Sequence, residues 1–140
     1  MSYIKPLPAI DNWNRGFWAA AKEERLAAPH CLDCGHVFFP PGACCPHCLS
    51  QRLDWKTLSG RGTVESWTVF HQLYYKGFAS ELPYNVAVIN LEEGISLMSN
   101  IVGIPNDHIE SGMAVEVVFE KATDDITIPK FRPIGPVRPA

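Results

Sequence analysis

Two Cys-x-x-Cys turns, at Cys31–Cys34 and Cys45–Cys48, constrain the fold of this chain more than any other feature. Ten residues separate the two turns, and each turn presents two thiolates from one tight loop. Zn²⁺ prefers four such soft ligands in a tetrahedron, so these four cysteines are predicted to bind one zinc ion. Four thiolates leave no open coordination position for water or substrate, and the predicted site is therefore structural.

The segment that holds all five cysteines, residues 26–58, is too small to bury an adequate core of its own. Metal binding is therefore expected to supply much of its folding free energy. Iron in the same cage, as in a rubredoxin electron carrier, satisfies the same geometry, and a redox dithiol is a further alternative. Cys44 and His47 also stand at permitted ligand spacings, so either one remains an alternative ligand in the second turn.

The 140-residue chain divides into three unequal pieces. Residues 1–25 are expected to form an N-terminal arm and a helix, and residues 26–58 a zinc ribbon. Residues 59–140 are expected to form an OB-fold domain that ends in an extended Pro-rich tail. Twelve prolines and ten glycines favour short strands and tight turns over a helical bundle.

The helix is expected over residues 11–25, with Asp11 or Asn12 as its N-cap. Trp13 and Phe17 are four residues apart and share one face, while Trp18 lies about 100° around the helix. So short a helix is unstable alone and must dock on another surface. The aromatic stripe either caps the ribbon or forms a partner-binding face. The candidate partner-binding residues are Trp13, Phe17 and Trp18.

Alternating apolar and polar residues predict that the rest of the chain is mostly β. Within the ribbon, strands are expected over 36–42 and 53–58. The five strands expected after the ribbon cover residues 63–72, 84–91, 95–102, 114–121 and 126–132. A polar connection at 105–111 is expected to form one helical turn. Five strands with a short helical interruption between the third and fourth is the order of an OB-type barrel.

The first of these barrel strands shows the alternation most clearly. Its period of two predicts that Val64 and Ser66 face one side of the sheet and that Trp67 and Val69 face the other. The fold class is thus predicted as mostly β, with an N-terminal helix, a zinc ribbon and a five-stranded OB-type barrel.

Charge and hydropathy exclude several classes of protein. Twelve Lys and Arg against fifteen Asp and Glu give a formal charge of −3. This balance argues against a nucleic-acid-binding protein driven by counterion release, because such proteins are usually basic. No apolar run approaches the roughly 18 residues needed to span a bilayer, and no signal-peptide apolar region follows Met1. The expected compartment is the reducing cytoplasm, where cysteines serve as metal ligands or free thiols more often than in disulfides.

A series of short motifs runs through the chain in a characteristic order. They are Cys31-x-x-Cys34-Gly35, Phe39-Pro40-Pro41, Cys45-Pro46-x-Cys48, Ser59-Gly60-Arg61-Gly62, Leu91-Glu92-Glu93-Gly94 and Phe131-Arg132-Pro133. This order resembles the acyl-CoA-associated family that joins a rubredoxin-like zinc ribbon to a C-terminal OB fold, formerly classed as a domain of unknown function. The resemblance covers residues 11–133.

The resemblance implies an accessory subunit without catalytic residues of its own. Members of this family pair with thiolase-like enzymes, hydroxymethylglutaryl-CoA-synthase-like enzymes or aldolases of the lipid-transfer-protein type, and some accompany MaoC-type hydratases. In such hetero-oligomers the partner carries the catalytic residues, and the ribbon–OB subunit helps to hold the CoA ester or completes the entrance to the site.

A CoA ester requires an aromatic or apolar slot and a few cations near its phosphates. The loop between the first two barrel strands, where OB folds commonly bind ligands, supplies aromatic and basic side chains. The candidate acyl-CoA-binding residues are Arg61, Tyr74, Tyr75 and Lys76. The alternative is that the tyrosines pack on the end of the barrel and that Lys76 is only solvated.

Two other classes of function are disfavoured. Zinc ribbons and OB folds also bind nucleic acids, but from Arg61 onward six basic and ten acidic residues leave a net charge of −4. An independent enzyme would need a nucleophile–base arrangement or a phosphate loop, and the sequence contains no Gly-x-Ser-x-Gly, Gly-rich phosphate-binding or His-Glu-x-x-His motif.

Overall fold

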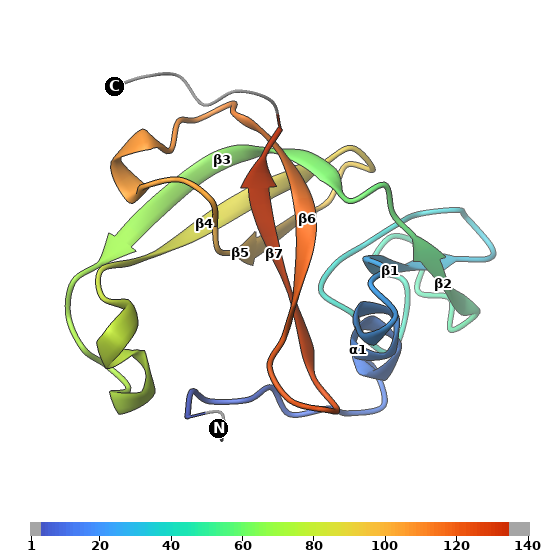
Figure 1. The fold of residues 1–140 in the computed structure, drawn as a ribbon. Helices are drawn as coiled ribbons and strands as arrows, with labels where there is room; N and C mark the ends of the chain where they lie inside the picture. Colours follow the sequence, from blue (N-terminus) through green and yellow to red (C-terminus); the bar gives the residue numbers. More distant parts are fainter. Residues whose placement is uncertain (1–3, 135–140) are drawn as a thin grey trace.

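Regular structure begins with a short helix, α1 (Arg15–Lys22), which follows an irregular N-terminal arm (Figure 1). The computed structural model describes residues 4–134, so most of the expected Pro-rich tail lies outside the described residues. Asp11 Oδ1 accepts hydrogen bonds from the N–H groups of Trp13 (2.9 Å) and Asn14 (2.8 Å). Asp11 therefore caps the turn that leads into α1, and the helix is shorter than the predicted span at both ends.

Two antiparallel strands form the sheet of the ribbon, β1 (Ala27–Cys31) and β2 (Leu53–Thr57). The prediction of β2 is confirmed, whereas β1 was not anticipated. The strand predicted over 36–42 is wrong, because only an isolated bridge between His30 and Val37 forms there. Pro40 and Pro41 lack backbone N–H groups, and this segment runs as a loop towards the second cysteine turn.

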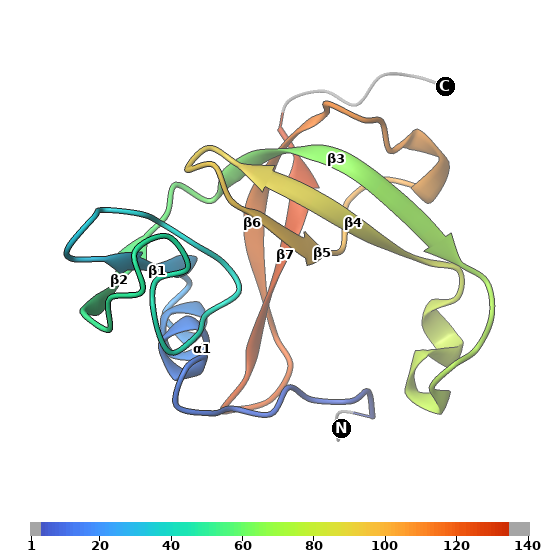
Figure 2. The ribbon, with the colours of Figure 1, turned by 180° about the vertical axis from the view of Figure 1, so that it is seen from behind.

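The second sheet contains five antiparallel strands in the order β5-β4-β3-β6-β7. Their bounds are β3 (Arg61–Phe70), β4 (Tyr84–Leu91), β5 (Ser96–Ser99), β6 (Ala114–Lys121) and β7 (Thr127–Pro133). The sheet curls so that its edges approach each other (Figures 1 and 2). The Phe131 N–H donates to the Asn100 carbonyl at 2.9 Å, and the Val102 N–H donates to the Phe131 carbonyl at 2.8 Å. These bonds link the two edges in an OB-like half-barrel, which confirms the predicted fold class.

A β-bulge in β3 overturns one prediction about which side chains share a face. Val64 lies opposite Ile89, but the register shifts before Trp67, which lies opposite Ala87. Ile89 and Ala87 are two residues apart and share a face, so Trp67 lies on the same face as Val64. The predicted alternation fails because the bulge inserts one extra residue into the strand.

Ribbon and barrel share one apolar core. Phe17 of α1 and Ala28 of β1 belong to the same buried cluster as Ile89, Val115 and Phe131 of the barrel. Helix α1 therefore docks on this protein's own body rather than standing free. Two 3-10 turns, η1 (Lys76–Glu81) and η2 (Asn106–His108), interrupt the barrel connections. None of the described helices has the length and apolar character needed to cross a membrane.

Candidate functional site

The two cysteine turns have the same backbone geometry. In the first turn the Gly35 N–H donates to the Cys31 carbonyl at 2.9 Å, and in the second the Leu49 N–H donates to the Cys45 carbonyl at 2.8 Å. Both residues that close these turns have positive φ, +78° at Gly35 and +64° at Leu49. Glycine adopts this conformation without steric cost in the first turn, whereas the second turn adopts it at a leucine.

The four cysteine sulfurs gather at one point. Their Sγ atoms all lie within 4.8 Å of one another, with 3.4 Å between Cys31 and Cys48 and 3.7 Å between Cys34 and Cys45. Four sulfurs at about 2.3 Å from a zinc ion would lie about 3.8 Å apart in a tetrahedron. Cys31 and Cys45 are buried while Cys34 and Cys48 are exposed. This all-thiolate set fits a structural Zn²⁺ ion.

The electrostatics of the cluster favour a bound cation. The backbone N–H of Cys34 is the main cause that lowers the pKa of Cys31 to about 6. The pKa of Cys48 rises instead to about 12, because the effect of the Ser50 N–H, which favours its thiolate, is outweighed by the adjacent Cys31 sulfur and by desolvation. One thiolate thus forms readily and suppresses the next, so four neighbouring thiolates require a compensating positive charge.

The structure also shows where the alternative ligands lie. Cys44 is half-buried and is not a member of the four-sulfur cluster. The His47 backbone N–H donates to the Cys45 sulfur at 3.4 Å, and its ring lies against that of His36 with 5.4 Å between centroids. The four sulfurs of the two Cys-x-x-Cys turns therefore form the cluster, and the alternative ligands Cys44 and His47 lie outside it.

A polar contact ties the first cysteine turn to the segment after the second. The Asp33 carboxylate accepts hydrogen bonds from the Ser50 hydroxyl and from the Arg52 guanidinium. These two donors, Ser50 first, lower the pKa of Asp33 below its ordinary value. These hydrogen bonds therefore connect the first cysteine turn to residues 50–52 independently of the four sulfurs.

The candidate acyl-CoA-binding residues fall into two separate places. Tyr74 and Tyr75 follow the end of β3 and are 60% and 59% exposed, and Lys76 opens η1 beside them. Arg61 stands at the opposite end of the ten-residue β3. At about 3.3 Å per residue that strand spans about 30 Å, so Arg61 does not join the Tyr-Tyr-Lys group.

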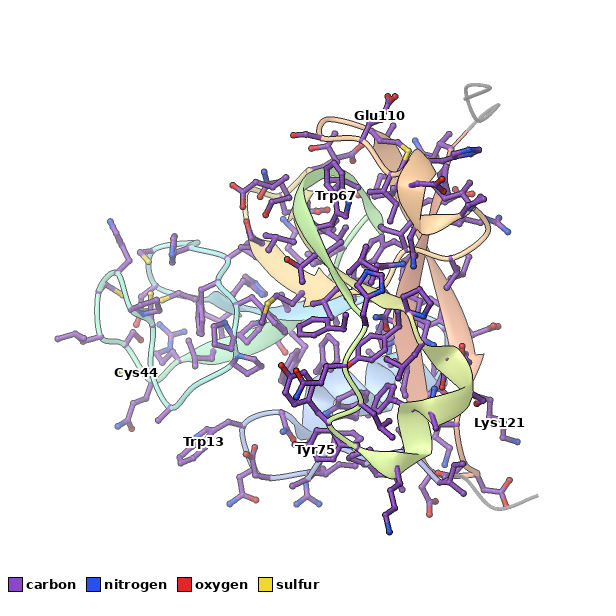
Figure 3. The ribbon with its side chains drawn as sticks, turned by 90° about the vertical axis from the view of Figure 1, so that its left-hand side faces the viewer. Trp13, Cys44, Trp67, Tyr75, Glu110 and Lys121 are labelled. Atoms are coloured by element: carbon purple, nitrogen blue, oxygen red, sulfur yellow. The ribbon has the colours of Figure 1, made fainter. Side chains whose placement is uncertain are left out.

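The aromatic residues predicted on the N-terminal helix differ in exposure. Phe17 is buried, and its ring packs against Trp18 at 4.9 Å and Phe39 at 5.5 Å between centroids. Trp13, by contrast, remains 54% exposed (Figure 3). Phe17 and Trp18 therefore help to join α1 to the rest of the protein, and Trp13 is the residue of the stripe that stays accessible.

A zinc ribbon followed by a curled five-stranded sheet defines the class of protein, a metal-stabilised ribbon joined to an OB-fold domain. Two family models match in the same order. The ChsH2 rubredoxin-like zinc ribbon domain matches residues 18–54, and the ChsH2 C-terminal OB-fold domain matches residues 55–120. The chain belongs to this ChsH2 family of zinc-ribbon and OB-fold proteins.

Similar proteins include both scaffolds and enzyme subunits. A "DUF35 domain-containing scaffold protein" of Methanocaldococcus jannaschii is 36% identical over 125 residues, which are 84% of this chain and 88% of that protein. A "probable enoyl-CoA hydratase alpha subunit" of Thermomonospora curvata is 42% identical over 135 residues, 95% of this chain. This chain spans only 41% of that longer protein.

A solved structure resembles almost the whole chain. It is described as an "Ltp2-ChsH2(DUF35) aldolase" and has a TM-score of 0.84 with 42% sequence identity. The match covers 91% of this chain and 98% of the solved one. The likeness therefore includes both the ribbon and the half-barrel.

Proposed function

We propose that this chain is a non-catalytic, zinc-containing accessory subunit that binds an acyl-CoA ester and supports a thiolase-like partner enzyme acting on a carbon–carbon bond. The observation that carries the proposal is the match to the chain of the Ltp2-ChsH2(DUF35) aldolase, 98% of which is covered. Correspondence over nearly a full chain favours a subunit of the same kind, with the chemistry performed by the partner.

The names of other relatives support the same role. The Methanocaldococcus protein is described as a scaffold, and the Thermomonospora protein as the alpha subunit of a hydratase. Both descriptions fit a module that assembles with other components. A hydratase- or aldolase-type partner is therefore the alternative to a thiolase-like one, and identification of the partner decides between them.

The site chemistry supports an accessory role for the metal. Four thiolates complete a zinc coordination sphere and leave no position at which a substrate carbonyl or water could be activated. The metal would then stabilise the ribbon, and the ribbon in turn holds α1 against the barrel.

Exposed aromatic side chains provide candidate contacts with the partner. Trp13 and Tyr75 remain 54% and 59% exposed, and such amphipathic rings are enriched at the centres of protein interfaces (Figure 3). Tyr74 has similar exposure, and its ring lies nearly perpendicular to that of Phe70 with 6.1 Å between centroids. We assign Trp13 and the Tyr74–Tyr75 pair to partner or ligand contacts in the complex.

A pull-down of the tagged, zinc-loaded chain from its host extract, followed by mass spectrometry, tests the proposal. We expect an acyl-CoA enzyme subunit in stoichiometric amount, and less of it with Trp13→Ala or Tyr75→Ala. Leu49→Ala, which alters a 74% exposed apolar side chain of the ribbon, is the matched control. A chain that elutes alone, or with nucleic acid that high salt removes, would overturn the proposal in favour of a nucleic-acid-binding module.

A further inference from the structure

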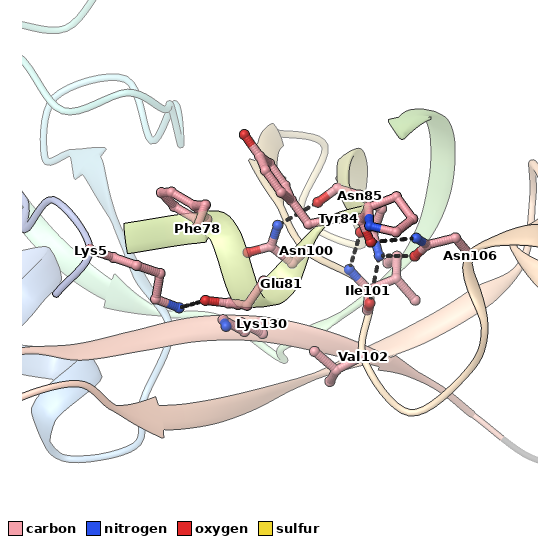
Figure 4. A pocket seen from close by; sticks show the side chains of 11 residues that line it. Lys5, Phe78, Glu81, Tyr84, Asn85, Asn100, Ile101, Val102, Asn106 and Lys130 are labelled. Carbon is pink, nitrogen blue, oxygen red and sulfur yellow. Dashed lines mark hydrogen bonds and ion pairs between the residues drawn. The ribbon is translucent and has the colours of Figure 1, made fainter. Parts of the chain in front are cut away.

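A polar pocket of about 260 Å³ lies between the N-terminal arm, η1 and the half-barrel (Figure 4). Its walls include Lys5 of the arm, Phe78 and Glu81 of η1, Asn85 of β4 and Lys130 of β7. Pockets that enclose a whole drug-sized ligand usually measure about 300–1,000 Å³. This one suits a fragment of a larger ligand, with the remainder lying outside.

Two lysine ammonium groups reach the same end of the pocket from different elements (Figure 4). The side chains of Lys5 and Lys130 are only 12% and 10% exposed. Each ammonium pairs with a carboxylate at 2.8 Å, Lys5 with Glu81 and Lys130 with Glu120. Burial of an ammonium is costly without such a partner, and each carboxylate offsets this cost for the lysine that it contacts.

The carboxylates stand further out than the lysines they contact. Glu81 and Glu120 side chains are 40% and 45% exposed, so each can turn into solvent when another anion takes its place. Glu120 is not among the residues that line the pocket. Both lysines of the lining are thus neutralised by carboxylates, and an anion that displaced these carboxylates would meet two ammonium groups.

The opposite end of the pocket is a fixed cluster of amides (Figure 4). Asn85 Nδ2 donates to the Ile101 carbonyl at 2.8 Å and to Asn106 Oδ1 at 2.9 Å. Asn106 Nδ2 in turn donates to the Pro83 carbonyl at 3.0 Å. These bonds hold the wall in place before any ligand arrives, which lowers the entropic cost of binding.

We propose that this pocket binds the phosphate groups of a CoA ester, with Lys5 and Lys130 as the cations that contact them. The inference rests on the proposed acyl-CoA-binding function and assigns its phosphate subsite to residues different from the Tyr74–Lys76 loop. Two buried lysines at one end suit a pyrophosphate or 3′-phosphate, because ammonium–phosphate hydrogen bonds are strong in a partly desolvated site. The Phe78 ring, 5.5 Å from the Lys5 ammonium, adds an apolar wall beside the phosphates.

The arm reaches the pocket because of one glycine in η1. A Cβ atom on Gly77 would lie 2.3 Å from the Ile4 carbonyl oxygen and 2.9 Å from the Lys5 Cα. The backbone of the arm therefore packs directly on Gly77, and Lys5 is held over the pocket. Gly77→Ala must push the arm away and remove the Lys5 ammonium from the site.

Calorimetric titration of the zinc-loaded full chain with CoA at low ionic strength tests the assignment. We expect Lys130→Gln and Lys5→Gln each to weaken CoA binding about tenfold, and Gly77→Ala to resemble Lys5→Gln. Lys121→Gln is the matched control, since Lys121 is a neighbouring β-strand lysine whose side chain is 68% exposed. Pantetheine, which lacks the phosphates, should bind more weakly than CoA and should not distinguish these variants.

Three results would overturn the inference: no binding of CoA to the folded chain, equal affinity for CoA and pantetheine, or equal losses in Lys121→Gln and Lys130→Gln. Zinc content and thermal unfolding of each variant verify its fold. If Lys130→Gln does not fold, Lys5→Gln, which changes only the N-terminal arm, still tests the site. A Lys130→Gln chain that retains both CoA affinity and its partner would refute the subsite and leave the accessory role intact. Loss of the partner from the wild-type pull-down would refute the role alone.

Discussion

The ribbon and the half-barrel are stabilised in different ways. Apart from the face that it shares with the barrel, the ribbon has a buried cluster of only Cys31, Phe38 and Cys45, and two of these three residues belong to the four-sulfur group. The barrel contributes most of a continuous apolar core that includes Ile89, Val115 and Phe131. A bound metal ion would thus stabilise the ribbon, whereas buried apolar side chains stabilise the barrel.

This difference predicts that the two parts respond to different kinds of damage. The barrel contributes most of the shared apolar core, and a bound metal ion would allow the small ribbon and α1 to pack on it without a large core of their own. The shared cluster through Phe17 and Ala28 couples the two parts. Loss of the metal should therefore damage the ribbon most, whereas loss of apolar volume should damage the barrel most.

The largest effect is expected from removal of a cysteine of the four-sulfur group. Cys31→Ser should reduce bound zinc from about one ion per chain to almost none, because a structural site supplies the folding free energy of its module. Hydrogen exchange should then show loss of protection in β1 and β2, with β3 to β7 still protected. Metal analysis of Cys44→Ser provides the control, since this adjacent thiol lies outside the cluster. Full zinc content in Cys31→Ser would disprove the four-cysteine assignment.

A cavity in the barrel should give the converse result. Phe131 is fully buried, so Phe131→Ala is expected to cost about 3–5 kcal/mol in unfolding free energy. Denaturant unfolding measures this loss, and zinc content below the transition should be unchanged. Met98→Ala, at a 73% exposed position, should change stability by no more than about 0.5 kcal/mol. Zinc loss at the same step as barrel unfolding would mean that the two parts are not separable.

An intermediate effect is expected at the closure of the barrel. The buried Asn85 side chain accepts a hydrogen bond from the Ile101 N–H at 2.7 Å and donates to the Ile101 carbonyl. Asn85→Ala leaves both groups without that partner and should cost about 1–3 kcal/mol. Faster exchange of the Ile101 amide would report the loss locally. A variant as stable as wild type would show that water replaces the amide at no cost.

The smallest effects are expected at the two cysteine turns and should have opposite signs. Gly35→Ala must place a side chain at φ +78° and should cost about 1 kcal/mol, although no atom lies within 4 Å of the added Cβ. Leu49→Gly removes a side chain from φ +64° at an exposed position and should be neutral or stabilising by up to about 1 kcal/mol. Thermal unfolding of the ribbon measures both, and equal destabilisation would contradict the common turn geometry.

Features determined by neighbouring residues were predictable from the sequence. The spacing of Cys31, Cys34, Cys45 and Cys48 predicted a cluster that the structure assembles, because each turn closes through its own backbone. The places of β2 to β7 along the chain were predictable for the same reason, since alternation and turn residues act locally.

Features that depend on distant contacts were not predictable. The bulge between Val64 and Ser66 depends on how β3 pairs with its neighbours, and no local residue in that strand indicates it. Lys130 lies in a strand predicted correctly, yet its burial depends on Glu120 and on segments remote in sequence. The docking of the arm on Gly77 is likewise a tertiary contact, with only an unexplained glycine as its signal.

Reconstitution of the partner's activity tests the central claim most directly. The copurified acyl-CoA enzyme would be assayed alone, with the wild-type chain, with Cys44→Ser and with Cys31→Ser, and each chain would also be assayed without the enzyme. The accessory role predicts that wild type and Cys44→Ser raise turnover equally, that Cys31→Ser does not, and that no chain acts by itself. Turnover of acyl-CoA by the chain alone, or partner activity indifferent to its presence, would contradict the account.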